Sequence, residues 1–172
     1  MDIIDNIPMI TIEEGKSIEE DLVAILIERN LIIATAESCT GGLIASRLVN
    51  VSGVSAVFKQ GFITYDNTVK HETLGVPLGA LAQYGAVSSI VAGFMAEGVA
   101  SAATADIGLA STGIAGPDGG TQEKPVGLVY IGICFNNQTY VRECRFTGNR
   151  QEIRELTVVN GLNMLLQLLK SM

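Results

Sequence analysis

The feature of this sequence that most limits its fold is a pair of short apolar segments, each followed at once by a polar, glycine-bearing turn. Residues 31–36 are apolar with β-branched residues in the middle, which predicts a buried strand, and residues 37–42 form the turn. Residues 107–111 predict a second such strand, which leads into a glycine-rich segment over 113–127. Because ligands in open α/β sheets bind beyond the carboxyl ends of strands, these two turns are the first places to expect a functional site.

The remaining segments supply helices and further strands. Ser17 with Glu20 three residues later predicts a capping box, and Asn30 is a plausible end for the helix that it begins. Residues 57–65 predict a strand, and residues 126–135 and 138–146, joined by Asn136-Asn137, predict a β-hairpin. Further helices are expected after residue 43, from Asp66 or Asn67, over 77–84, from Ser88 to about Thr104, and from Asn149 to Leu169.

This mixture predicts a three-layer α/β/α single domain with a mixed β-sheet, in which the hairpin supplies the antiparallel strands. The 172 residues suit one domain, which we place at residues 17–172. Residues 1–16 have no clear period and are expected to form an N-terminal extension. The small residues of the helix over 88–104 indicate close packing against a neighbour, and with the apolar balance they favour a homo-oligomer, a dimer first.

Composition excludes several classes of function. The net charge of −7 argues against nucleic acid as a partner, although local backbone donors can still bind a phosphate. No apolar run is long enough for a membrane span, and the acidic start is unlike a signal peptide, so we expect a cytoplasmic protein. Three cysteines and the single His71 offer no metal-ligand spacing, so neither a metal nor another cofactor is expected.

The first turn offers a nucleophile. Ser38 and Thr40 carry hydroxyls, Gly41 and Gly42 let the backbone approach a ligand, and the helix behind presents free N–H groups to an anion or an oxyanion. The alternative is that Ser38 or Thr40 merely caps the helix. Cys39 is a rival nucleophile, unless it is only a small buried side chain.

The second turn suits a backbone cradle for a phosphate or a carbonyl group. Four glycines within eight residues are costly in chain entropy. A backbone cradle accounts for that cost better than the alternative, a mobile surface loop. Arg150 follows at the start of the last helix, where its planar fork can bind a phosphate, unless it is an ordinary surface arginine. The binding candidates in and near this segment are Thr112, Gly113, Gly116, Asp118, Gly119, Gly120, Lys124 and Arg150.

A serine nucleophile needs a base, and two residues could provide one. His71 is the first, but the Gly-x-Ser-x-Gly motif of a nucleophile elbow does not occur. Lys70 lies in a mostly apolar neighbourhood, and burial would favour its neutral form. The alternative for Lys70 is a solvated lysine on a short helix.

Six segments together resemble the CinA carboxy-terminal domain family, whose stand-alone members are nicotinamide mononucleotide deamidases. The resemblance covers roughly residues 17–170, with the segments in the same order as in the family. They are Thr35–Gly42, Thr64-Tyr65 through Lys70, Gly85–Ser88, Thr112–Gly120, Lys124–Gly127 and Gly148-x-Arg150.

The resemblance implies hydrolysis of the carboxamide of nicotinamide mononucleotide to nicotinic acid mononucleotide and ammonia, in pyridine-nucleotide recycling. It implies Ser38 as nucleophile, Lys70 as base and Tyr65 as a residue that orients the lysine or relays its proton. Larger members carry an amino-terminal domain related to molybdopterin-binding proteins, and no activity of that domain is expected here. The alternative is a non-catalytic nucleotide-binding module linked to competence or DNA-damage responses, which would need neither Ser38 nor Lys70.

Overall fold

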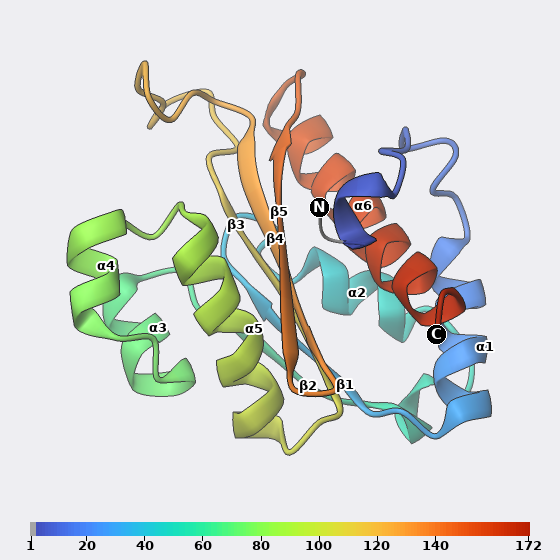
Figure 1. Ribbon diagram of the computed structural model, residues 1–172. Helices are drawn as coiled ribbons and strands as arrows, with labels where there is room; N and C mark the ends of the chain where they lie inside the picture. Colours follow the sequence, from blue (N-terminus) through green and yellow to red (C-terminus); the bar gives the residue numbers. More distant parts are fainter. Residues whose placement is uncertain (1–2) are drawn as a thin grey trace.

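Five strands form one mixed sheet in the order β2-β1-β3-β4-β5, as seen in the computed structural model, which describes residues 3–172 (Figure 1). The first three strands along the chain are parallel, and the last two form the antiparallel hairpin. The prediction of an α/β fold with a mixed sheet is therefore confirmed. The strands are β1 (Ile33–Glu37), β2 (Phe58–Ile63), β3 (Ile107–Gly113), β4 (Leu128–Phe135) and β5 (Gln138–Arg145).

Helices cover both faces of this sheet, which gives the three predicted layers (Figure 1). One face carries α1 (Ile18–Arg29), α2 (Leu43–Val49) and α6 (Arg150–Lys170), and the other carries α3 (Asn67–Leu74), α4 (Leu78–Tyr84) and α5 (Ser89–Ala103). Two short 3-10 helices, η1 (Ile3–Asn6) and η2 (Val54–Ala56), complete the elements. Each face buries its own apolar cluster against the sheet.

The strand order reverses direction at β1. The chain passes from β1 through α2 to β2 on one side, and then crosses back through α3, α4 and α5 to β3 on the other side. In α/β sheets a crevice opens where the connections from adjacent strands leave in opposite directions. The carboxyl ends of β1 and β3 therefore mark the expected place for a ligand.

Most predicted helix starts use the expected caps, and one does not. Asp66 accepts a hydrogen bond from the Thr68 N–H at 2.8 Å, and Asn149 forms a full capping box with Glu152. The capping box predicted at Ser17 is wrong: this residue is left-handed, with φ of 66°, and its side chain makes no cap hydrogen bond. Left-handed backbone at Ser17 replaces the extended conformation that an N-cap normally has, so its hydroxyl is not turned onto the helix end.

The segment before α1 lies against α6 and β5 (Figure 1). The Asn160 side chain accepts a hydrogen bond from the Ile10 N–H at 2.8 Å and donates one to the Ile10 carbonyl at 2.9 Å. Ile4 and Ile7 are buried, and Arg142 donates to the carbonyls of both. Residues 3–16 are thus packed as part of the α6 layer; residues 1–2 of the predicted extension lie outside the described part of the chain.

Small residues let α5 approach the sheet closely. A Cβ atom added to Gly108 on β3 would lie 2.0 Å from the Ala96 carbonyl oxygen, and one added to Gly132 on β4 would lie 2.5 Å from the Ala92 carbonyl oxygen. The close packing predicted for the helix over 88–104 is therefore within the chain. It no longer argues for an interface between copies, so the homodimer stays a prediction.

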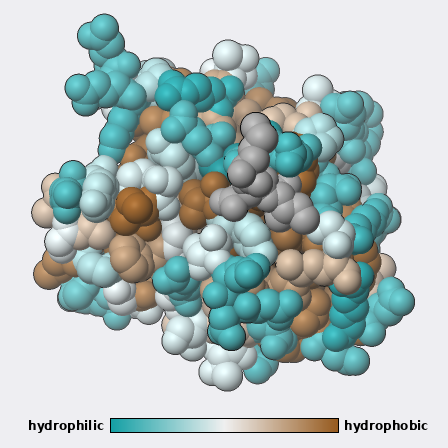
Figure 2. Space-filling view, viewed as in Figure 1, coloured by the Kyte–Doolittle hydropathy of each residue, from teal (hydrophilic) through white to brown (hydrophobic). Residues whose placement is uncertain are grey.

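Hydrophilic side chains cover the segment after β3 that projects from the molecule (Figures 1 and 2). Within residues 3–172 no helix is long and apolar enough to cross a membrane.

We expect Gly108→Ala to lower the free energy of unfolding by about 3 kcal/mol, because the added methyl group would overlap backbone that cannot move independently of α5. Gly79→Ala is the matched control. Gly79 lies in α4 with no heavy atom within 4 Å of an added Cβ, and alanine there should raise the free energy of unfolding by up to about 1 kcal/mol. Denaturant titrations of both variants measure these changes, and equal midpoints would contradict the packing described here.

Candidate active site

The register of the parallel strands brings two chain segments together at the carboxyl edge of the sheet. Beyond the last residue of β1, the Ser38 N–H donates to the Ser111 carbonyl of β3 at 3.0 Å. On the other side, the Thr64 N–H donates to the Glu37 carbonyl at 2.9 Å. These bonds extend the ladder by one step, so Ser38 is held beside the chain that leaves β2.

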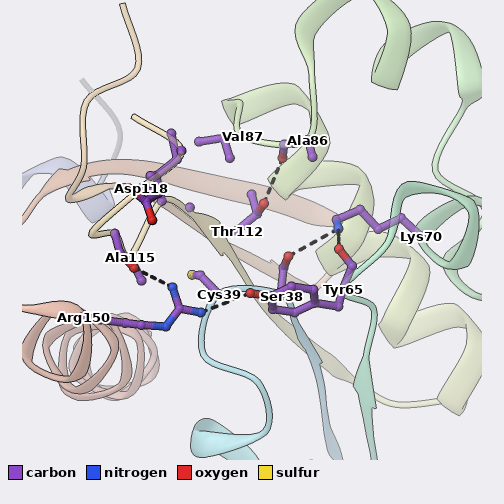
Figure 3. A pocket seen from close by; sticks show the side chains of 14 residues that line it. Ser38, Cys39, Tyr65, Lys70, Ala86, Val87, Thr112, Ala115, Asp118 and Arg150 are labelled. Carbon is purple, nitrogen blue, oxygen red and sulfur yellow. Dashed lines mark hydrogen bonds between the residues drawn. The ribbon is translucent and has the colours of Figure 1, made fainter. Parts of the chain in front are cut away.

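Lys70 reaches this position from α3, whose start is capped by Asp66. Its side chain is only 1% exposed. The Nζ atom lies 3.3 Å from Ser38 Oγ, 2.8 Å from the Thr64 carbonyl oxygen and 3.1 Å from the Tyr65 carbonyl oxygen (Figure 3). The structure therefore brings together the predicted nucleophile and the predicted base, and the amine is buried rather than solvated.

The surroundings of Lys70 make its amine easier to deprotonate than an ordinary lysine. Burial lowers the pKa of this amine, and the nearby Asp66 and Cys39 oppose the shift. A neutral amine has two N–H groups and one lone pair, and carbonyl oxygens can only accept hydrogen bonds. When the Thr64 and Tyr65 carbonyls take both N–H groups, the lone pair is left for the Ser38 hydroxyl. The amine is then oriented as a base toward the serine.

The two rival residues lack these properties. Burial raises the pKa of the Cys39 thiol to about 12, so little thiolate is present at neutral pH. His71 is exposed, and its Nδ1 atom lies 2.9 Å from the Val76 carbonyl oxygen, outside the pocket that Ser38 lines. Both observations favour Ser38 and Lys70 over these alternatives.

The N-terminus of α2 already holds an anion that belongs to the chain. The Glu37 carboxylate is 1% exposed and accepts hydrogen bonds from the N–H groups of Gly42, Ile44 and Ala45 and from the Thr40 hydroxyl. The sequence pattern predicts that these helix N–H groups face a ligand. Glu37 occupies them, so the first turn keeps the nucleophile but not a phosphate site at its helix end.

One backbone N–H group remains as a candidate oxyanion donor in the first turn. Those of Ser38, Gly41 and Gly42 are bonded to Ser111, Ser38 and Glu37, respectively. Within the described chain, no hydrogen bond is recorded for the N–H groups of Cys39 and Thr40. Cys39 follows the nucleophile directly, as oxyanion donors often do, and lines the pocket, whereas Thr40 is fully buried.

A pocket of about 280 Å³ opens beside Ser38 and Lys70 (Figure 3). The second glycine segment supplies much of its wall, and the connection between α4 and α5 supplies the opposite wall through Ala86 and Val87. The predicted site residues that line the pocket are Ser38, Cys39, Tyr65, Lys70, Thr112, Gly113, Gly116, Asp118, Gly119 and Arg150. Those that do not line it are Thr40, Gly41, Gly42, Gly120 and Lys124.

Arg150 connects the second glycine segment to Tyr65. Its guanidinium donates to the Gly116 carbonyl at 2.6 Å and to the Tyr65 hydroxyl at 3.1 Å. The Tyr65 side chain is 62% exposed. It is thus the main-chain carbonyl of Tyr65 that orients Lys70, while the phenol group contacts Arg150.

Lys124 has a structural role and does not line the pocket. Its Nζ atom donates to the Tyr84 and Val87 carbonyls, each at 2.7 Å. The Thr112 hydroxyl donates to the Ala86 carbonyl of the same connection at 2.9 Å. Lys124 therefore joins the end of the glycine segment to the opposite wall of the pocket, which fixes its width.

Sequence reasoning missed Glu37, Ser111 and Arg154. Arg154 donates from Nε to the Cys39 carbonyl at 3.2 Å and from Nη2 to the Thr40 carbonyl at 2.7 Å. A signal for Glu37 was present, since Thr40 follows it at the spacing of a local hydrogen bond. Arg154 lies one helical turn after Arg150, but its partners are more than a hundred residues away in sequence. Among residues 3–172 no group of three or more His, Cys, Asp or Glu side chains could hold a metal ion.

A family model for the CinA C-terminal domain matches residues 15–169. The chain belongs to this family. Among solved structures, a CinA superfamily protein from Escherichia coli is similar with a TM-score of 0.92 and 34% identity, over 98% of this chain and 99% of that one. A competence/damage inducible protein from Agrobacterium tumefaciens has a TM-score of 0.87 and 41% identity, over 90% of this chain and 95% of that one.

Longer relatives share the same domain. A putative competence-damage inducible protein from Acetivibrio thermocellus is 56% identical over 151 residues, which are 88% of this chain and 37% of the relative. A CinA-like protein from Dictyoglomus turgidum is 54% identical over 153 residues, with the same two shares. This chain of the CinA family thus spans a little over a third of the length of these curated relatives.

Proposed function

We propose that this chain hydrolyses the carboxamide of nicotinamide mononucleotide, giving nicotinic acid mononucleotide and ammonia. The observation that carries the proposal is the 3.3 Å contact between Ser38 Oγ and the buried amine of Lys70, two residues that line the same pocket. An activated serine beside a neutral lysine is suited to acyl transfer from an amide. The family resemblance of the motifs around both residues favours a pyridine nucleotide as the substrate.

The proposed reaction has two stages. Ser38 Oγ attacks the amide carbon while Lys70 takes the serine proton, and the N–H group of Cys39, which lines the pocket, stabilises the oxyanion by roughly 3–4 kcal/mol. The protonated Lys70 then gives its proton to the leaving nitrogen, and ammonia departs. A water molecule, deprotonated by Lys70, then attacks the acyl carbon, the bond to Ser38 Oγ breaks as Lys70 returns the proton to that oxygen, and the acid is released.

The second glycine segment and Arg150 are the proposed phosphate site. Glu37 fills the N-terminus of α2, so the first turn has few donors left for a dianion. Arg150 lines the pocket from the start of α6, and the backbone of Gly116 and Gly119 borders the same space. This division puts the amide near Ser38 and the phosphate near Arg150.

Ser38→Ala and Lys70→Met are each expected to lower kcat for ammonia release by about 1000-fold or more, because either change removes the nucleophile or its base. The assay measures ammonia from nicotinamide mononucleotide, and circular dichroism with a thermal melt checks that each variant is folded. Normal turnover by folded Ser38→Ala would refute the assignment of the nucleophile. Binding of the nucleotide by the unmodified chain without ammonia release would instead favour a non-catalytic nucleotide-binding module.

The pH dependence should report the amine of Lys70. Burial lowers its pKa, and only the neutral form is a base, so kcat/KM should rise with pH and level off above an apparent pKa that lies below the ordinary lysine value. Initial rates across a pH series at low substrate concentration measure this limb. A limb centred at or above the ordinary lysine value would contradict the proposed neutral base.

Arg150→Met should raise KM for nicotinamide mononucleotide by about 10- to 100-fold with a small change in kcat, since a charge-assisted contact to the phosphate is lost. The riboside, which lacks the phosphate, should show the same KM with both proteins. Arg145→Met is the matched control, because Arg145 pairs with Glu143 on β5 and does not line the pocket. Equal KM increases for nucleotide and riboside would place the phosphate elsewhere.

A further inference from the structure

The Glu37 carboxylate is buried without an ionic partner. It accepts four hydrogen bonds, all from residues 40–45 of the turn and helix that follow Ser38. Among the residues that the structure describes, no lysine or arginine forms an ion pair with it. A buried charge is costly unless its hydrogen bonds are satisfied, so the positions of these donors are tightly coupled to Glu37.

A relay of hydroxyl groups extends this contact to the neighbouring strand. The only hydroxyl hydrogen of Thr40 is donated to Glu37 at 2.6 Å. In the contact of 2.7 Å between the Thr40 and Ser111 hydroxyls, Ser111 must therefore be the donor. The Ser111 carbonyl in turn accepts the Ser38 N–H. Together with the covalent chain, these hydrogen bonds form a closed loop that connects the Glu37 side chain to the Ser38 N–H.

The carbonyl groups of the same turn are fixed from the opposite side. Arg154 binds the Cys39 and Thr40 carbonyls, and the Gly41 N–H binds the Ser38 carbonyl at 3.2 Å. In a trans peptide the C=O and N–H groups point in opposite directions. The N–H groups of Cys39 and Thr40 must therefore point away from Gly41 and Arg154, respectively.

We propose that Glu37 is a positioning residue for the Ser38 nucleophile: its carboxylate fixes the turn in which the Ser38 hydroxyl meets Lys70 and in which the N–H group of Cys39 stays free. Glu37 touches neither the pocket nor a reacting atom. Its catalytic readout rests on the proposed amidase function, whereas its effect on the reactivity of Ser38 does not.

Glu37→Gln is the sharpest variant, because it keeps the shape of the side chain and exchanges one acceptor oxygen for a donor group. That group cannot accept a hydrogen bond from a backbone N–H or from the Thr40 hydroxyl. We expect kcat for ammonia release to fall by about 100-fold, because a small misplacement of the nucleophile is enough to slow the reaction by that factor. KM should stay within about twofold, because the proposed phosphate site lies on the other glycine segment.

Two further variants separate positioning from general stability. Thr40→Val keeps the Glu37 carboxylate but removes the hydroxyl that joins it to Ser111, and should lower kcat by about tenfold even if Glu37→Gln does not fold. Asn160→Ala removes the buried bonds to Ile10 far from the pocket. It should lower the melting temperature and leave kcat unchanged.

The second readout is the rate at which a fluorophosphonate labels Ser38, followed by mass spectrometry, with Ser38→Ala as the blank. Slow labelling of Glu37→Gln and Thr40→Val, with normal labelling of Asn160→Ala, supports the inference even if nicotinamide mononucleotide is not hydrolysed. Wild-type kcat and labelling in folded Glu37→Gln would overturn it while leaving the proposed function intact. Equal losses in Asn160→Ala, or a wild-type Ser38 that neither labels nor turns over substrate, would overturn it as well.

Discussion

A lysine amine that is withdrawn from water at the edge of a sheet is the constraint on which the rest of the site depends. The amine of Lys70 needs acceptors, and it finds them in the carbonyls of Thr64 and Tyr65, where the chain leaves β2. Ser38 is the next polar group within reach, because β1 and β2 are parallel neighbours and end together. The register of the sheet, the cap of α3 at Asp66 and the burial of the amine together hold Lys70 Nζ beside Ser38 Oγ.

The two glycine-bearing turns are similar in sequence but have different roles in the structure. In the first, Glu37 supplies the anion for the helix N-terminus, so the turn is stabilised from within and its remaining donors lie next to Ser38. In the second, the residues after β3 border an open pocket that Arg150 also lines. This local arrangement suits an anionic ligand although the chain as a whole carries a net charge of −7.

Packing between α5 and the sheet fixes the opposite wall of the pocket. Gly108 and Gly132 allow backbone contact between this helix and strands β3 and β4. The start of α5 and the connection before it then lie within reach of Thr112 and Lys124, whose side chains bind the carbonyls of that connection. The helix whose small residues predict a close neighbour thus packs, through Ala92 and Ala96, against the sheet of its own chain.

The sequence by itself determined what depends on neighbours along the chain. The apolar segments of β1 and β3, the hairpin, the caps at Asp66 and Asn149 and the candidates Ser38 and Lys70 all follow from local patterns. Only the tertiary structure determined the hydrogen-bond partners that lie far away in the sequence. Lys124 binds backbone carbonyls instead of lining the pocket, and Arg154 binds the turn that carries Ser38 from 114 residues away. Such choices depend on distances between segments that are brought together by sheet register and core packing, and no local pattern records those distances.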